Sequence, residues 1–189
     1  MTRPFDRPVL RAPDSGNGSG NGNGNGRPSA ASVAAARAAG LMVGRKGLIM
    51  GVANERSIAW GIAKACHAAG AELAFTYQGD VFGQRVKPLV QSIGAKVVVP
   101  ADVEDEASLD ALFDTLARTW GTLDFVVHAI AYSDKDELKG RYVDTTRANF
   151  QRSLTISCYS FTDIAHRAEP LMQNGGSLLT LTYSGARHV

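Results

Sequence analysis

The chain has 189 residues, of which 44% are hydrophobic and 20% are charged, and its formal net charge is +2. These values are ordinary for one globular domain with its own core, and the near balance of charge gives no field that would gather nucleic acid or anionic lipid. No apolar stretch approaches the roughly 20 residues of a transmembrane helix, and the N-terminus lacks the apolar region of a secretory signal. We therefore expect a cytoplasmic protein that binds neither nucleic acid nor membrane.

The cysteine and histidine content argues against a metal site or a disulfide. The two cysteines, Cys66 and Cys158, both fall in apolar patterns with helical spacing, which favours reduced thiols in the core. The four histidines show no metal-ligand spacing.

Residues 1–40 differ in composition from the rest. The Gly-Asn repeat between residues 14 and 26 is of low complexity and cannot form a core, so we interpret residues 1–40 as a disordered extension and residues 41–189 as the folded domain. The alternative is an organelle transit peptide, because the segment is rich in Arg, Ser and Ala.

From residue 41 onwards, apolar runs alternate with helical periodicity. Strands are predicted at residues 47–52, 71–76, 96–99, 123–130 and 177–182, and helices at 57–69, 81–93, 105–120 and 150–168. Pro88 should kink or interrupt the second helix. The first helix should bury one face, formed by Ile58, Ile62, Ala65, Cys66 and Ala69.

This order predicts an α/β fold, a Rossmann-type doubly wound parallel sheet with right-handed crossovers. A fold of this kind normally continues with another helix and one or two strands, whereas the pattern stops just past the fifth strand. We therefore expect the sheet to be incomplete at the C-terminus.

A glycine and a helix start follow the first strand. Gly51 ends the apolar run, and the helix opens at Ser57 and Ile58. Glycine lets a ligand approach the backbone, and the unpaired N–H groups at a helix start attract a pyrophosphate. The spacing Gly-x5-Ser-Ile-Ala differs from the common G-x-G-x-x-G, and an ordinary strand-to-helix turn remains the alternative.

The next two strands end in residues suited to the adenosine half of a dinucleotide. Gln78 is neutral where NAD-binding folds usually carry an acid and NADP-binding folds a base, which favours NADH. Asp102 and Val103 follow the third strand, where a carboxylate could accept a hydrogen bond from the adenine amino group. The alternatives are a solvated loop residue for Gln78 and a helix N-terminal acid for Asp102.

Small residues and a tyrosine follow the last two strands. The run from His128 to Ala131 would let the ribose and the nicotinamide end pass close to the backbone, with His128 packed or hydrogen-bonded rather than catalytic. Tyr183 lies past the fifth strand, where its hydroxyl could touch a substrate carbonyl or simply lie at the edge of the core.

Together these segments closely resemble the bacterial NADH-dependent enoyl-acyl-carrier-protein reductases of the short-chain dehydrogenase/reductase superfamily. The resemblance runs from about residue 43 to residue 189 and rests on GLIMGVANERSIAWGIA, AELAFTYQ, LDFVVHAIAYSDKDELKGRYVDT, ISCYSF and GGSLLTLTYSGA. HAIA stands where ordinary short-chain dehydrogenases have an Asn-Ala-Gly motif.

The resemblance implies that NADH reduces a trans-2-enoyl thioester carried by acyl carrier protein, while a tyrosine hydroxyl stabilises the enolate that develops. It also implies a homotetramer, assembled mostly through the long helix at residues 150–168 and the helix after it. The family's cofactor contacts fall on Gly51, Ser57, Ile58, Gln78, Asp102, Val103 and Ile130. Ser133 falls where the family meets its acyl substrate, and Tyr183 matches the first of two active-site tyrosines.

The second family tyrosine, and the lysine seven residues beyond it, have no counterpart before Val189. We therefore expect little turnover from this chain. Two other functions remain open: a different short-chain dehydrogenase that acts on a ketone or an alcohol, and a nucleotide-binding fragment without catalysis.

Overall fold

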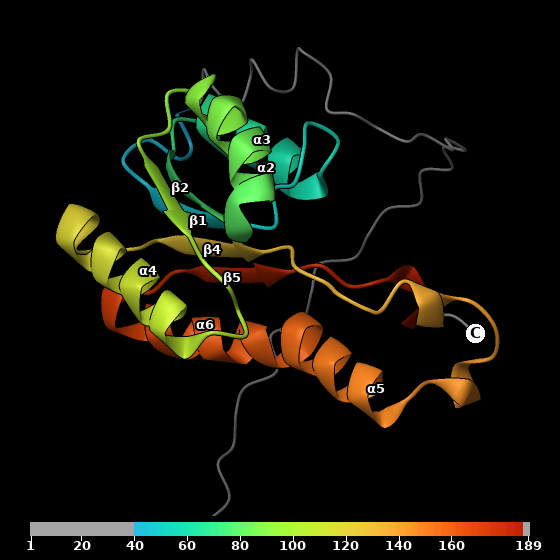
Figure 1. Ribbon diagram of the computed structural model, residues 1–189. Helices are drawn as coiled ribbons and strands as arrows, with labels where there is room; N and C mark the ends of the chain where they lie inside the picture. The colour runs from blue at the N-terminus through green and yellow to red at the C-terminus, as the bar shows by residue number, and fades with distance from the viewer. Residues whose placement is uncertain (1–39, 187–189) are drawn as a thin grey trace, which may run out of the picture.

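A five-stranded parallel sheet forms the centre of the protein. The computed structural model describes residues 40–186, and its strands lie in the order β3-β2-β1-β4-β5 (Figure 1). The strand bounds are β1 Lys46–Met50, β2 Glu72–Tyr77, β3 Val97–Pro100, β4 Phe125–His128 and β5 Ser177–Thr180. All four neighbouring pairs are parallel, which confirms the predicted doubly wound sheet.

Helices cover both faces of the sheet. One face carries α2 (Ile58–Ala68) and α3 (Gly79–Gln91), and the other carries α4 (Glu106–Trp120), α5 (Arg147–Leu154) and α6 (Ser160–Ala168), as Figure 1 shows. Short 3-10 turns occupy Asp136–Leu138, Tyr142–Asp144, Glu169–Leu171 and Ser184–Ala186. No helix within residues 40–186 has both the length and the apolar character needed to cross a bilayer.

The apolar strands supply a core to each layer of helices. Leu48 and Met50 of β1 belong to the cluster beneath α4 and α6, whereas Ile49 belongs to the cluster beneath α2 and α3. All three side chains have no exposed surface. Successive side chains of a strand point to opposite faces, so a strand covered on both sides must be apolar throughout.

All nine predicted strands and helices are present, with shifts at their ends. Helix α4 matches the prediction closely: the Asp105 carboxylate accepts a hydrogen bond from the N–H of Ala107, and Gly121 ends the helix with φ of +66°. Helix α3 runs through Pro88 without interruption. The predicted extension lies outside the described residues, apart from Gly40.

The predicted buried face of α2 is correct in part: Ala69 is buried, and Ile62 and Cys66 are half-buried and pack against the core, whereas Ile58 does not. The buried side chains are Ala59, Trp60 and Ala63, whereas Ile58 is 67% exposed. Trp60 packs against Phe75 of β2 with ring centroids 6.3 Å apart, so the buried face also includes the Trp60 side of the helix.

The predicted long helix is divided by a π turn at Thr155–Tyr159, between α5 and α6. The turn buries Ile156 and leaves Cys158 exposed, so the expectation of a core thiol was wrong for Cys158. Cys66 is half-buried, and burial raises the pKa of its thiol. A π turn inserts one extra residue, so helical periodicity beyond it no longer predicts the inner face.

Candidate functional site

A cavity of about 230 Å³ lies at the carboxyl ends of β1, β2 and β4. Strand β1 lies between β2 and β4, so the strand order reverses at β1 and the cavity lies at this topological switch point of the sheet. Its lining residues are Gly51, Val52, Ala53, Thr76, Tyr77, Gln78, Phe82, Ala101, Val103, Ala129, Ile130, Ala131, Tyr132, Arg152 and Ile156. Of the predicted site residues, the structure brings Gly51, Gln78, Val103 and Ile130 to this wall.

Gly51 forms part of the lining in a conformation that disfavours any other residue. Its φ is +95°, and a Cβ atom there would lie 2.6 Å from the carbonyl carbon of Ala129. The Ala129 N–H donates to the Met50 carbonyl at 3.2 Å, which ties the two strand ends together. The absence of a side chain therefore lets the ends of β1 and β4 lie close together beside the cavity.

Ser57 does not line the cavity but shapes the loop beside it. It is the N-cap residue of α2, yet its Oγ accepts hydrogen bonds from the N–H groups of Ala53 and Asn54, each at 3.0 Å. Helix α2 thus has no side-chain cap and no acid in its first turn, in contrast to α4. An uncapped helix start of this kind suits an anionic group.

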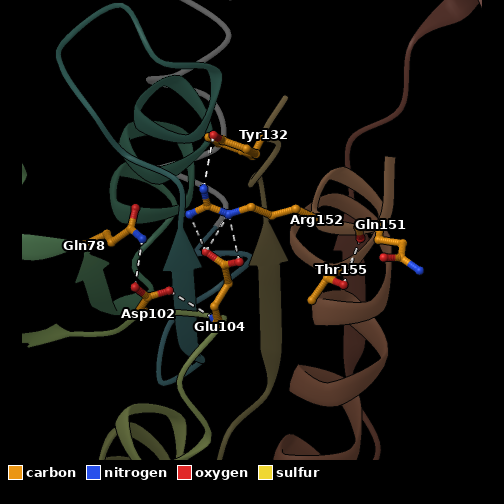
Figure 2. Close-up of polar contacts among 7 residues, drawn as sticks. All are labelled: Gln78, Asp102, Glu104, Tyr132, Gln151, Arg152 and Thr155. Carbon is orange, nitrogen blue, oxygen red and sulfur yellow. Dashed lines mark hydrogen bonds and ion pairs between the residues drawn. The ribbon is translucent and has the colours of Figure 1, made fainter. Parts of the chain in front are cut away.

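Gln78 and Asp102 form a polar pair beside the cavity. Figure 2 shows the Gln78 amide donating to the Asp102 carboxylate at 2.9 Å, while the other carboxylate oxygen accepts from the Glu104 N–H at 2.9 Å. The residue that caps the N-terminus of α4 is Asp105, so Asp102 does not cap this helix but bonds within the loop that precedes it. Tyr77 precedes Gln78 in the chain, and the Lys87 ammonium lies 4.9 Å from the centroid of the Tyr77 ring.

The segment after β4 is fastened to α5 and the π turn. The Ser157 hydroxyl accepts from the Tyr132 N–H at 2.9 Å and bonds to the Tyr132 carbonyl at 3.2 Å. Farther along, the Asn149 amide donates to Ser133 Oγ at 3.2 Å and accepts from the Asp134 N–H at 2.8 Å. Ser133 therefore lies beyond the cavity lining, in a loop whose position α5 controls.

His128 is a packed, hydrogen-bonded residue, as predicted. It has no exposed surface, and its Nε2 lies 2.7 Å from Ser160 Oγ. Ser160 donates its hydroxyl proton to the Ile156 carbonyl at 2.6 Å, so the imidazole must donate through Nε2. Burial lowers the pKa of His128 below its ordinary 6.5, which favours the neutral ring.

Ile58 and Tyr183 also lie outside the cavity lining. Ile58 is 67% exposed at the start of α2, and Tyr183 is 82% exposed past β5. Conversely, sequence analysis missed Tyr132 and Arg152, both of which line the cavity. Tyr132 directly follows the small-residue run after β4 and so carried a signal, whereas Arg152 lies within a helix and carried none.

The family model for enoyl-(acyl carrier protein) reductases matches residues 51–189. The chain belongs to this family. It is 61% identical over 150 residues to enoyl-(acyl-carrier-protein) reductase (NADH) 2 of Rhizobium meliloti (strain 1021), an alignment that covers 79% of this chain and 56% of that protein.

Solved structures of enoyl-(acyl carrier protein) reductases share the fold. The reductase from Anaplasma phagocytophilum, in complex with NAD, matches with a TM-score of 0.77 and 62% identity over 79% of this chain and 57% of its own. The Bacillus cereus reductase, with NADP+ and an indole naphthyridinone, matches with a TM-score of 0.76 and 43% identity over 79% of this chain and 59% of its own. The chain thus spans between 56% and 59% of the lengths of these three relatives.

Proposed function

We propose that the cavity binds NADH and that the protein reduces trans-2-enoyl thioesters carried by acyl carrier protein. The observation that carries the proposal is the side-chain-free approach at Gly51 beside the uncapped start of α2, at the switch point of the sheet. The names of the relatives support it, since the Rhizobium meliloti protein is a reductase that uses NADH.

The residues around the cavity fit a dinucleotide. A pyrophosphate would lie between Gly51 and the first turn of α2, where Ser57 holds the loop and Ile58 begins the helix. The adenosine half would then lie toward the Gln78–Asp102 pair and Val103. Ile130 and its small neighbours would border the nicotinamide half.

The charge near Gln78 supports NADH over NADPH. The Asp102 carboxylate accepts a hydrogen bond from the Gln78 amide, so an extra phosphate on the adenosine ribose would meet a like charge. Lys87, the cation nearby, contacts the Tyr77 ring. We therefore expect NADPH to bind more weakly than NADH.

Bound NADH supplies a hydride for the β-carbon of the enoyl thioester. The protein's part is to orient the two molecules and to stabilise the negative charge that develops on the thioester oxygen. We assign Tyr183 to that oxygen as a hydroxyl donor and Ser133 to the acyl substrate. Both lie on segments past the carboxyl ends of strands, as substrate contacts in this fold do.

We further infer a cytoplasmic homotetramer. Phe150, Leu154 and Tyr159 are 44%, 48% and 61% exposed along α5 and the π turn, which leaves apolar surface for a second subunit. Size-exclusion chromatography with light scattering tests this directly, and a monomer at all concentrations would contradict it.

The deciding experiment is an NADH titration of the purified chain by fluorescence, followed by addition of trans-2-octenoyl N-acetylcysteamine. Saturable NADH binding and slow thioester-dependent NADH oxidation, slower still in Tyr183→Phe, are the expected results. A Gln78→Arg variant should shift preference toward NADPH, because arginine accommodates the additional phosphate.

Other outcomes identify the competing functions. Oxidation of NADH with ketones but not with enoyl thioesters supports a different short-chain dehydrogenase. Binding without any turnover supports a nucleotide-binding protein, and no binding overturns the proposal.

A further inference from the structure

Arg152 connects three segments at the edge of the cavity. Figure 2 shows its side chain leaving α5 toward Glu104 in the loop after β3, with Nε 3.0 Å from Oε1 and Nη2 2.8 Å from Oε2. Its Nη1 donates to the Tyr132 hydroxyl at 3.3 Å, and its Cζ lies 4.7 Å from the Tyr132 ring centroid. The guanidinium is therefore fixed from two directions, by a forked ion pair and by an aromatic ring.

The bridge lies at the adenosine side of the proposed cofactor site, so this inference rests on the proposed function. Glu104 directly follows Val103, and both Val103 and Arg152 line the cavity. The loop after β3 is rich in acids: Asp102, Glu104, Asp105 and Glu106 fall within five positions. An unpaired Glu104 would add its charge beside a ligand that itself carries a negative pyrophosphate.

We propose that Arg152 is a positioning residue for dinucleotide binding, which holds the Glu104 carboxylate and neutralises it at the edge of the cavity. In this role Arg152 acts through Glu104 and not by contact with the cofactor. The Tyr132 contacts keep the guanidinium in the one orientation that meets both carboxylate oxygens. No feature of the sequence alone pairs these residues, which are 48 positions apart.

The test measures NADH and AMP affinity of the purified chain and its variants by fluorescence and calorimetry. Arg152→Met keeps the length of the side chain but removes the charge, and should raise the Kd for both ligands about 3–10-fold, as expected for loss of a forked, partly exposed pair. The affinity for nicotinamide mononucleotide, which lacks the adenosine half, should fall less in Arg152→Met than the affinity for AMP does. The defect should shrink at high salt, because the repulsion left behind is between charges near the surface.

Glu104 variants separate neutralisation from direct contact. Glu104→Gln alone should bind NADH at least as tightly as the unmodified chain, and the double variant Arg152→Met/Glu104→Gln should recover at least half of the loss. Arg45→Met is the matched control: Arg45 is also an exposed arginine paired with a carboxylate, Asp124 at 2.7 Å, but it lies at the opposite end of the sheet.

The outcomes are distinct. Equal Kd values for the unmodified chain and Arg152→Met overturn this inference and leave the proposed function standing. A double variant as weak as Arg152→Met, or a weakened Glu104→Gln, also overturns it, because Arg152 would then act on the ligand directly. If the unmodified chain binds neither NADH nor AMP, the proposed function fails and the inference fails with it.

Discussion

Two glycines ten positions apart should respond to the same substitution with opposite signs. Gly51 has φ of +95°, and a Cβ atom there would run into the backbone carbonyl of Ala129, whereas a Cβ at Gly61 meets no atom within 4 Å. Gly51→Ala therefore combines backbone strain of about 1–2 kcal/mol with overpacking of about 1–3 kcal/mol. Gly61→Ala lies in α2 and should stabilise the protein by about 0.5–1 kcal/mol.

Urea denaturation followed by far-ultraviolet circular dichroism measures both changes in the free energy of unfolding. Gly51→Ala should lower the free energy of unfolding by about 2–5 kcal/mol, the sum of backbone strain and overpacking, while Gly61→Ala should raise it. The Ala129 carbonyl is backbone, and the N–H of the same residue donates to the Met50 carbonyl, so the carbonyl cannot rotate away as a side chain would. A Gly51→Ala protein within about 0.5 kcal/mol of the unmodified chain would refute this reasoning.

Two further predictions concern the buried network of His128. Ser160→Ala removes the acceptor of the His128 Nε2–H and should lower the free energy of unfolding by about 1–3 kcal/mol. The control is Ser92→Ala, which loses an exposed bond to the Leu89 carbonyl, equal in length (2.6 Å) to the bond from Ser160 to the Ile156 carbonyl, and should change stability by less than about 0.5 kcal/mol. Equal losses in the two variants would contradict the prediction. Burial lowers the pKa of His128, so the unfolded chain takes up the proton first and the free energy of unfolding should fall as pH drops below 6.5. Urea midpoints across this range should show a smaller decline in His128→Gln, and an unchanged decline would show that other groups cause it.

Several local features could be predicted because their causes are local. Helix α4 carries its own start at Asp105, its own apolar stripe and its own stop at Gly121, all within one segment. The position of Gly51, after a buried strand and before a helix, could likewise be predicted from the order of residues along the chain. Such signals depend only on residues that are close together in the sequence, so the sequence alone is enough to predict them.

The errors have a shared physical origin in packing between distant segments. The face of α2 depends on where Trp60 meets Phe75, and the π turn places Ser160 against His128, 32 positions earlier. Helical periodicity assumes a regular helix and a known inner side, and neither assumption holds there.

The sequence by itself determined the parallel α/β fold, the order of its elements and the glycine that lines the cavity, because strand alternation, helix caps and glycine conformation are properties of short segments. Only the tertiary structure decided which polar side chains meet around that cavity. The Gln78–Asp102 pair and the Glu104–Arg152 bridge join positions 24 and 48 residues apart. Such contacts exist only once crossovers bring the carboxyl ends of several strands and the face of α5 together, and no local pattern encodes that meeting.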